Sequence, residues 1–353
     1  MRLLLLIFSA ATATQRIVIN TWPFVDANKA AWKVLANGGS ALDAITAGTS
    51  KCEALQCDGS VGWGSHPDAT GEVTLDAMIM DGQTANVGAV GALRHVRDAA
   101  KVARHVLDNT AHTLLVGSMA SDFANEMGFI NQTLESDKTR QEHAKWISSK
   151  CQPNYYMNVT PDPKSSCGPF SPISNENDVQ IHRRRHLLVS EKNHDTIGMI
   201  AFDVNGKTAA GTTTNGMINK IPGRVGDSPI AGAGSYINEH GGAAATGDGD
   251  VMMRFLPTYQ TVESMRLGMS PRQAALDALN RIVTKYDGFV GAIIAINARG
   301  EYGAACHNIN NFPYVISSDA TGGSSETLYQ TCSKTHDELK QLMRVAFHRS
   351  KFH

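Results

Sequence analysis

The chain has 353 residues, enough to bury a substantial core, and its hydrophobic and charged fractions of 42% and 18% are those of an ordinary globular protein. Its 32 lysine and arginine residues nearly balance 33 aspartate and glutamate residues. Because charge of one sign does not accumulate, the composition gives no support for binding to nucleic acid or to an anionic membrane. A small neutral substrate fits this balance better.

The chain starts with the features of a secretory signal peptide. One basic residue, a short apolar run and small residues fill positions 1–14, and Ala11-Thr12-Ala13 predicts removal near residue 13. The alternative, a membrane anchor, needs roughly 20 apolar residues. We therefore expect residues 1–13 to be removed and the protein to enter the secretory pathway. There, the Asn-x-Thr sequences at Asn131 and Asn158 would be glycosylated or would remain unmodified surface loops.

A second sign of export is the even set of six cysteines, because disulfides persist in that pathway. None of them has the spacing of a zinc site. Six cysteines allow 15 pairings, and loop closure alone favours near neighbours, such as Cys52 with Cys57 and Cys151 with Cys167. Spacing by itself leaves the pairing open.

Hydrophobic periodicity and turn residues predict short strands interleaved with helices. Asp26 and Ser40 are the expected caps of the first two helices, and Asn205-Gly206 predicts a hairpin turn. In chain order, the predicted elements are a strand over 17–20, helices over 26–37 and 40–55, a strand over 73–80, a helix over 96–107, a strand over 113–116, a helix over 121–127, strands over 196–202 and 207–213, helices over 258–267 and 271–285, strands over 290–297 and 303–306, and a frayed helix over 334–353.

Residues 152–193 lack periodicity and are rich in proline and polar residues, which predicts a long irregular connector. Its basic run, 182–186, is either a solvated loop or a site for protease trimming or anion binding. Strands and helices alternate on both sides of the connector, which indicates a mixed α/β fold. Periodicity does not separate a four-layer sandwich from a doubly wound sheet.

The segment that follows, Asn-His-Asp-Thr-Ile-Gly-Met-Ile over 193–200, resembles the self-cleavage junction of glycosylasparaginases, which are N-terminal-nucleophile hydrolases. Further matches at 20–24, 57–62, 75–82 and 302–306 stand in the family's order and cover nearly the whole mature chain. The resemblance implies one catalytic domain with the αββα sandwich of that fold. It also implies autoproteolysis between Asp195 and Thr196, giving an α chain of 14–195 and a β chain of 196–353.

Such a break would make Thr196 a complete catalytic unit, because a chain-terminal threonine carries both a hydroxyl nucleophile and an amine that can act as its base. In the family, the threonine hydroxyl attacks the preceding carbonyl, here that of Asp195, and water opens the resulting ester. A model α-amine has a pKa of about 7.7 to 8.0. We expect nearby positive charge and desolvation to lower it, so that the amine works in an acidic compartment.

The glycine-rich turn over 223–230 places Arg224 and Asp227 three residues apart. Such a pair suits a free amino acid, because Arg224 can hold an α-carboxylate with two hydrogen bonds and Asp227 can take an α-ammonium. The matching family positions bind the asparagine part of the substrate in this way. The alternative is a surface salt bridge.

Alternating glycines expose backbone N–H groups in Thr246-Gly247-Asp248-Gly249-Asp250, which fits a phosphate, an oxyanion or a calcium ion bound by Asp248 and Asp250. Phosphate is disfavoured because no Gly-Lys-Ser/Thr follows, and calcium because two carboxylates are too few. The resemblance implies an oxyanion hole made by the Thr246 hydroxyl and the Gly247 N–H.

The resemblance gives roles to three further residues. It sets Thr214 against the Thr196 hydroxyl, Ser60 beside the new amine and Trp22 in the wall of the pocket. The alternatives are an ordinary threonine-rich strand edge and a tryptophan of the core. A vertebrate disulfide is absent, with Ala275 and Ala295 near the places of its cysteines. The pairs implied by the match are Cys52 with Cys57, Cys151 with Cys167, and Cys306 with Cys332.

The resemblance therefore implies an amidohydrolase that cleaves the amide between N-acetylglucosamine and free asparagine through an aspartyl ester on Thr196, without metal or cofactor. It also implies a lysosomal or secreted location and a dimer of cleaved αβ pairs. Two alternatives remain. One is a relative that acts on asparagine or isoaspartyl dipeptides, and the other is an inactive secreted protein that binds amino acids through Arg224 and Asp227.

Overall fold

The computed structural model describes residues 15–173 and 196–349. Three features expected from the sequence lie outside these ranges: the signal peptide over 1–13, the basic run over 182–186, and Asp195 on one side of the expected cleavage point. Thr196, on the other side, is the first described residue after the gap.

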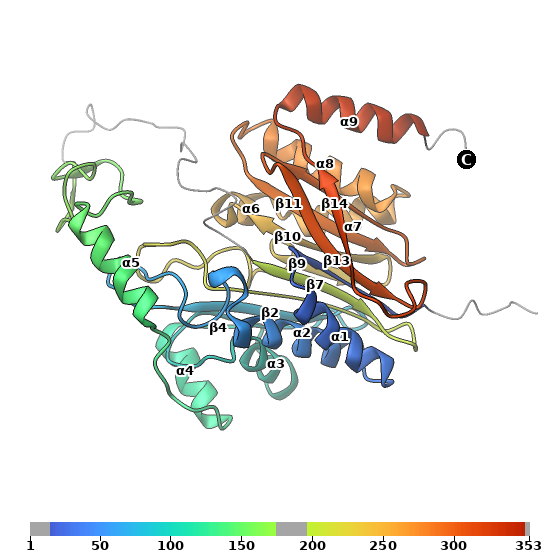
Figure 1. The fold of residues 1–353 in the computed structure, drawn as a ribbon, viewed down its shortest axis with the longest axis horizontal. Helices are drawn as coiled ribbons and strands as arrows, with labels where there is room; N and C mark the ends of the chain where they lie inside the picture. The colour runs from blue at the N-terminus through green and yellow to red at the C-terminus, as the bar shows by residue number, and fades with distance from the viewer. Residues whose placement is uncertain (1–14, 174–195, 350–353) are drawn as a thin grey trace, which may run out of the picture.

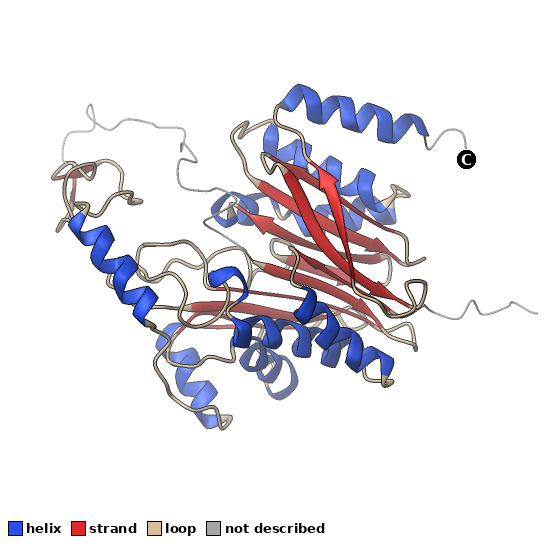
Figure 2. Cartoon of the chain, viewed as in Figure 1, coloured by secondary structure: helices blue, strands red, loops and turns tan. Residues whose placement is uncertain are grey.

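Two β-sheets pack face to face in the centre of the molecule (Figures 1 and 2). The eight-stranded sheet has the order β14 (Glu326–Thr331), β13 (Asn311–Ser318), β1 (Ile17–Thr21), β7 (Ile197–Phe202), β8 (Thr208–Thr214), β2 (Leu75–Asp81), β3 (Val87–Leu93), β4 (Leu114–Val116). The four-stranded sheet has the order β12 (Tyr302–His307), β11 (Gly291–Asn297), β10 (Gly241–Gly247), β9 (Ser235–Asn238). A small hairpin pairs β5 (Val159–Thr160) with β6 (Ser171–Pro172).

Helices cover the outer face of each sheet. The large sheet is covered by α1 (Val25–Ala36), α2 (Ala41–Leu55) and α3 (Ala99–Asn109), and the small sheet by α7 (Pro257–Arg266) and α8 (Pro271–Val283). The last helix, α9 (His336–Arg349), packs on α8. The remaining described helices are η1 (Cys57–Gly59), α4 (Gly117–Glu126), α5 (Asp137–Ser148) and α6 (Gly249–Phe255). The order helix, sheet, sheet, helix confirms the expected αββα sandwich.

Small residues allow the two sheets to approach each other. A Cβ added at Gly198 of β7 would lie 2.8 Å from Ala244 Cβ in β10, and one added at Gly242 would lie 2.8 Å from Ile200 Cγ2. Both distances are shorter than real Cβ contacts, so these positions require glycine. Strand β10, which reads Gly-Gly-Ala-Ala-Ala-Thr-Gly, was not predicted because glycine and alanine are rare in strands.

The predicted elements are present, with ends shifted by a few residues, and several others had no clear sequence signal. Ser40 caps α2 by accepting a hydrogen bond from Asp43 N, as expected. Asp26 is not a cap. Helix α1 starts one residue earlier, so Asp26 lies in its first turn. The tail expected to fray is helix α9, which buries Leu339 against the small-sheet core. The unpredicted elements are η1, β3, α5, β9, β10, α6, β13 and β14, together with the short hairpin of β5 and β6 inside the stretch predicted to be irregular.

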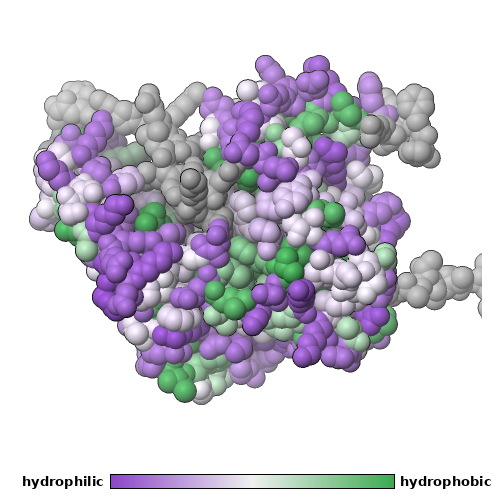
Figure 3. Space-filling view, in the orientation of Figure 1, coloured by the Kyte–Doolittle hydropathy of each residue, from purple (hydrophilic) through white to green (hydrophobic). Residues whose placement is uncertain are grey.

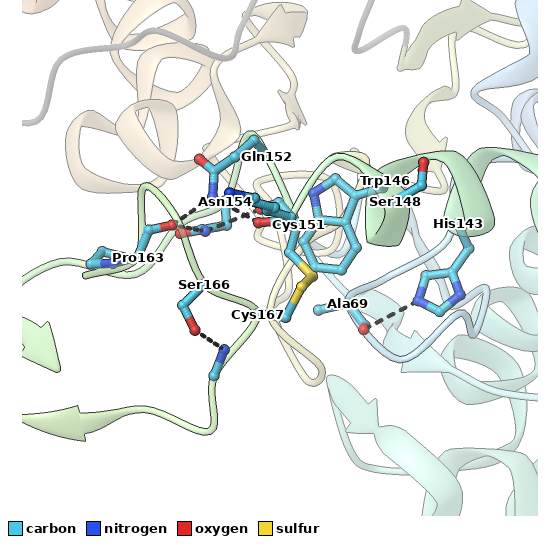
Figure 4. Close-up of a disulfide and its surroundings, with 12 residues drawn as sticks. Ala69, His143, Trp146, Ser148, Cys151, Gln152, Asn154, Pro163, Ser166 and Cys167 are labelled. Atoms are coloured by element: carbon cyan, nitrogen blue, oxygen red, sulfur yellow. Dashed lines mark hydrogen bonds between the residues drawn. A yellow bond between two sulfur atoms is a disulfide. The ribbon is translucent and has the colours of Figure 1, made fainter. Parts of the chain in front are cut away.

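The three expected disulfides are all confirmed: Cys52–Cys57, Cys151–Cys167 and Cys306–Cys332. The second closes the start of the proline-rich connector, where Asn154 Nδ2 donates to Pro163 O at 2.6 Å (Figure 4). Trp146 Nε1 also donates to Pro153 O there, at 2.7 Å. At the place of the absent vertebrate bridge, Ala275 and Ala295 are buried in one apolar cluster. Apolar packing therefore joins α8 to β11 there.

The molecular surface matches the balanced composition. Hydrophilic residues cover much of the face in Figure 3, with smaller hydrophobic areas between them. Asn131 is exposed and Asn158 is half-buried at the connector. Among residues 15–173 and 196–349, every helix is too short or too polar to cross a membrane.

A buried carboxyl, Glu53 of α2, joins the helical layer to the large sheet. Its Oε1 accepts hydrogen bonds from Ala100 N at 2.9 Å and Thr213 Oγ1 at 2.6 Å, whereas Oε2 has no partner among the described residues. Burial raises the pKa of Glu53 to about 8, although these two hydrogen bonds lower it. The charged groups nearby, Asp98 and Lys101, have small opposing effects. Glu53 is therefore neutral in acid.

This raised pKa predicts that the protein is more stable in acid. A carboxyl whose folded pKa exceeds its unfolded pKa stabilises the fold fully below the unfolded value, and the stabilisation is lost as pH rises toward 8. The expected loss between pH 5 and pH 8 is on the order of 3 kcal/mol. Glu53→Gln, which stays neutral, should melt about 5 °C above the wild type at pH 8 and close to it at pH 5. Calorimetric Tm values at both pH values test this, with exposed Glu126→Gln as the control. Equal Tm differences at both pH values would contradict it.

Candidate active site

Strand ends from both sheets meet at one edge of the sandwich. In the large sheet, β1 ends at Thr21, β8 ends at Thr214, and β7 starts immediately after Thr196. In the small sheet, β10 ends at Gly247 and contacts β7, β8 and β1. Antiparallel neighbours bring the start of one strand beside the end of the next. Residues far apart in the sequence, from Thr21 to Gly247, therefore come together here.

Thr196 is held by its backbone on both sides and is only 6% exposed. Its carbonyl oxygen accepts a hydrogen bond from Thr21 Oγ1 at 2.8 Å, and the same hydroxyl accepts from Gly198 N at 2.9 Å. Its backbone nitrogen lies 3.4 Å from Thr246 Oγ1, to which it donates. The described residues make no hydrogen bond to Thr196 Oγ1. The backbone nitrogen and carbonyl of Thr196 are thus fixed in place, whereas its hydroxyl has no hydrogen bond to a described residue.

The Thr246 hydroxyl connects Thr196 to Trp22. Its oxygen accepts hydrogen bonds from Trp22 Nε1 at 3.0 Å and from Thr196 N. A hydroxyl has two acceptor sites and one proton, so this arrangement leaves the proton free to be donated. Thr246 can therefore donate to a developing negative charge beside Thr196.

Trp22 lies mainly in the core, since it is 7% exposed and its ring packs edge-on against Phe312 with centroids 5.3 Å apart. Its backbone adopts the left-handed conformation, with φ of 61°. Such a conformation is unfavourable for a bulky residue and is often retained at functional sites. The indole of Trp22 contacts the site through its N–H group, on Thr246.

The glycine-rich loop after Thr246 requires a glycine at position 247. Gly247 has φ of 139°, and a side chain there would collide with Val290 O. Asp248 then caps α6, where its carboxylate accepts from Val251 N at 3.2 Å. Asp250 pairs with Arg224 at 3.0 Å. Because both carboxylates have these partners, the loop fits an oxyanion better than a calcium ion.

Thr214 ends β8 beside the start of β7. The register pairs Ile197 with Thr213, so the preceding Thr196 and the following Thr214 lie at neighbouring ends of the two strands. Thr214 Oγ1 accepts from Gly216 N at 3.0 Å, which leaves its own proton for another acceptor. Ser60 is buried next to this turn, and its carbonyl oxygen accepts from Asn215 N at 3.1 Å. Thr196 and Thr214 therefore lie at adjoining strand ends, and the Ser60 backbone contacts the residue after Thr214.

Arg224 is half-buried and Asp227 is buried, and the two do not form the surface salt bridge that was the alternative. Arg224 is 15% exposed and donates through Nη2 to Asp250, not to Asp227. Within the described chain, Arg224 Nε and Asp227 Oδ2 are buried without hydrogen-bond partners. Buried groups with unused hydrogen-bonding capacity are costly unless a ligand completes them. The two side chains can receive a carboxylate and an ammonium group.

The loop after β10 and the local charges shape the surroundings of these two groups. A side chain at position 249 would collide with Asp227 Oδ1 and lie 3.2 Å from Arg224 Nη2, so glycine is needed for the loop to lie against both groups. Burial raises the pKa of Asp227 to about 7, although the Arg224 charge lowers it. Burial also opposes the charge on Arg224, but the carboxylates of Asp250 and Asp76 outweigh it and raise the pKa of Arg224. An ammonium group placed beside Asp227 would favour its ionised form.

Sequence reasoning missed four residues that join this site. Thr21 and Asp76 lie in matched segments, 20–24 and 75–82, but neither received a role. Asp250 was considered only as a calcium ligand. Its ion pair with Arg224 forms only when the fold brings two separate loops together. Lys220 stood in a stretch without a recognised motif. Asp76 had a usable signal, because a single carboxylate inside an apolar strand must find partners.

The chain was compared with known proteins. The sequence model of the asparaginase family matches residues 5–324. An N(4)-(β-N-acetylglucosaminyl)-L-asparaginase of Rattus norvegicus is 52% identical over 297 residues, which cover 84% of this chain and 85% of the rat protein. The protein of the same name from Mus musculus is 52% identical over 298 residues, again covering 84% of this chain and 85% of its own. The chain therefore belongs to the asparaginase family and is an amidohydrolase.

Proposed function

We propose that the chain is a glycosylasparaginase, which hydrolyses the amide between N-acetylglucosamine and the side chain of asparagine. The observation that carries this proposal is the position of Thr196, whose nitrogen donates to the Thr246 hydroxyl, in the loop whose Gly249 lies against Asp227 and Arg224. These contacts support a proposed nucleophile close to a proposed binding site for an amino acid. The rat and mouse relatives carry the name of this activity.

Activation would be autoproteolysis between Asp195 and Thr196. In the uncut chain, the hydroxyl of Thr196 attacks the carbonyl carbon of Asp195, and the peptide becomes an ester that water opens. The products are an α chain ending at Asp195 and a β chain starting at Thr196. The hydrogen bonds that hold Thr196 N and O to Thr246 and Thr21 would keep the new terminus in place.

In the mature enzyme, the free amine of Thr196 takes the proton of its own hydroxyl, whose oxygen attacks the side-chain amide carbon of the substrate. The Thr246 hydroxyl and the Gly247 N–H stabilise the negative oxygen, a contribution worth about 2.7 to 4 kcal/mol per donor. The amine then protonates the departing glycosylamine, leaving an aspartyl ester on Thr196. Water, deprotonated by the same amine, hydrolyses this ester and releases aspartate.

The binding residues would recognise asparagine at its α-carbon. Arg224 takes the α-carboxylate and Asp227 the α-ammonium, while Thr214 orients the Thr196 hydroxyl and Ser60 holds the new amine. Trp22 acts mainly by fixing Thr246. Arg224 and Asp227 bind an α-carboxylate and an α-ammonium only when both groups are free. Proteolysis must therefore release the glycosylated asparagine from its peptide before this enzyme cleaves the amide.

We extend the proposal to the cellular setting and assembly. The signal peptide over 1–13, the cysteine pairs and the two acceptor asparagines support passage through the secretory pathway to a lysosome. The raised pKa of Glu53, which makes acid favourable for the fold, agrees with that compartment. A dimer of cleaved αβ pairs is the assembly we expect.

The purified protein should release aspartate from N4-(β-N-acetylglucosaminyl)-L-asparagine much faster than from an isoaspartyl dipeptide. Sequencing of the smaller fragment on a denaturing gel should start at Thr196. Preference for the dipeptide would favour an isoaspartyl peptidase of the same family. A single uncut chain that binds aspartate but hydrolyses neither compound would favour a binding protein.

A further inference from the structure

A buried lysine lies behind the proposed amino-acid site. Lys220 is 1% exposed and is the largest fully buried side chain of the described residues. Its Nζ donates to Asn215 O at 2.6 Å and to Thr74 O at 3.4 Å. Within the described chain, it has no carboxylate oxygen within 4.0 Å, so its charge is held by backbone carbonyls rather than by an ion pair. A buried charge with only neutral partners is expensive and calls for an explanation.

Lys220 holds the segment that connects two proposed functional residues. Residues 215–220 run from the end of β8, at Thr214, toward the turn that carries Arg224. Within this segment, Gly216 N donates to Thr214 Oγ1 and Lys220 Nζ binds Asn215 O. Tyr155 also holds this segment, because its Oη donates to Ile218 O at 2.9 Å. Loss of the Lys220 bond would therefore loosen the turn on which the Thr214 hydroxyl depends.

Lys220 also places a second positive charge beside Arg224. A Cβ added at Gly216 would lie 3.0 Å from Arg224 Nη1 and 3.4 Å from Lys220 Nζ, so the two cations flank the same glycine. Among the charged groups, Asp76 favours the charge of Lys220 most; its Oδ2 accepts from Gly226 N at 3.1 Å and its Oδ1 accepts from Ala92 N at 2.7 Å. Arg224 has its own ion pair with Asp250 at 3.0 Å, whereas Lys220 adds positive charge without such a partner within the described chain.

We propose that Lys220 is a positioning residue of the substrate-carboxylate subsite, where its ammonium fixes the turn after Thr214 and adds positive charge behind Arg224. The inference rests on the proposed function, because it takes the ligand of Arg224 to be the α-carboxylate of an amino acid. An incoming carboxylate on Arg224 is also attracted by the ammonium of Lys220. The affinity of the site for a carboxylate then depends on the charge of Lys220.

That charge can be changed by pH without a mutation. Burial lowers the pKa of Lys220 to about 8, with Asp76 raising it and Arg224 lowering it further. The other charged groups that face it are Asp68 and Glu72, in the loop before β2. Lys220 is thus charged at pH 6 and mostly neutral at pH 9.

The test compares L-aspartate with β-alanine, which is aspartate without its α-carboxylate. Both ligands keep their ammonium charge from pH 6 to pH 9. A change in their relative affinity therefore reflects titration of a group of the protein and not of the ligands. Calorimetric titration of the self-cleaved wild-type protein should show the preference for aspartate falling roughly fivefold to tenfold between these pH values. Lys220→Arg, which keeps its charge, should show no such fall. Lys220→Met should prefer aspartate, at both pH values, only as weakly as the wild type does at pH 9, and its kcat should be lower.

Two results would overturn the inference. One is a wild-type preference for aspartate that is the same at pH 6 and pH 9, and this measurement needs no variant to fold. The other is an equal fall in Lys220→Arg and the wild type, which would assign the titration to Asp227 or to the Thr196 amine. Equilibrium binding needs no turnover. A wild-type protein that binds aspartate as expected but does not hydrolyse glycosylasparagine would therefore contradict the proposed function and not this inference.

Discussion

Replacement of Thr196 by valine or alanine should leave the chain as one uncut polypeptide that releases no measurable aspartate. Both variants lose the hydroxyl that would attack the carbonyl of Asp195, so the amine of Thr196 is never freed. The expected loss of activity is on the order of 10⁴-fold or more, as for removal of other covalent nucleophiles. Thr196→Ser keeps the hydroxyl and should be cut and partly active. A denaturing gel and an aspartate-release assay measure both effects.

Valine has nearly the shape of threonine, so the Thr196→Val variant separates chemistry from folding. The hydrogen bonds at position 196 come from the backbone nitrogen and oxygen, which valine retains. Its Tm should therefore stay close to that of the uncut wild-type precursor. Thr208→Val is the matched control, because Thr208 is a buried threonine at the far end of β8 whose hydroxyl has no partner among the described residues. Two mature fragments from Thr196→Val would exclude autoproteolysis by this hydroxyl.

Local residue chemistry predicted features that depend on a few neighbouring residues. Ser40 as the cap of α2 and the Asn205-Gly206 turn were correct because they reflect the geometry of a helix start and of a turn. The roles of Thr196 and Gly247 were instead implied by the resemblance to glycosylasparaginases. A single threonine before an apolar strand is too common a pattern to identify a nucleophile.

Features that depend on distant neighbours could not be predicted in this way. Strand β10 is built from glycine and alanine because the facing sheet approaches closely at Gly198, a constraint that no local pattern shows. The burial of Arg224 depends on Asp250, and that of Lys220 on the carbonyls of Thr74 and Asn215. In each case, the partner is distant in the chain or lies in a turn whose path only the fold defines.

Arg224→Ala should raise KM for glycosylasparagine about 100-fold, with a smaller change in kcat. The guanidinium is proposed to donate two charge-assisted hydrogen bonds to the substrate carboxylate, and their loss amounts to about 3 kcal/mol. Arg224→Lys keeps the charge but not the planar guanidinium that donates two hydrogen bonds, so we expect its KM to increase roughly tenfold. KM and kcat from initial rates, taken with the binding of aspartate and β-alanine, measure both variants.

Removal of Arg224 also strips a cation from a region that contains Asp76, Asp227 and Asp250. The pKa of Asp227, which the Arg224 charge lowers, should then rise further in the alanine variant. The variant should therefore bind the substrate ammonium less well in acid, and its KM should fall only as pH rises above 7. Arg254→Ala is the control, because Arg254 is exposed and its one hydrogen bond to a described residue is to Tyr286 Oη at 3.0 Å. A KM for Arg224→Ala within threefold of the wild type, with β-alanine and aspartate bound as before, would remove Arg224 from the carboxylate subsite.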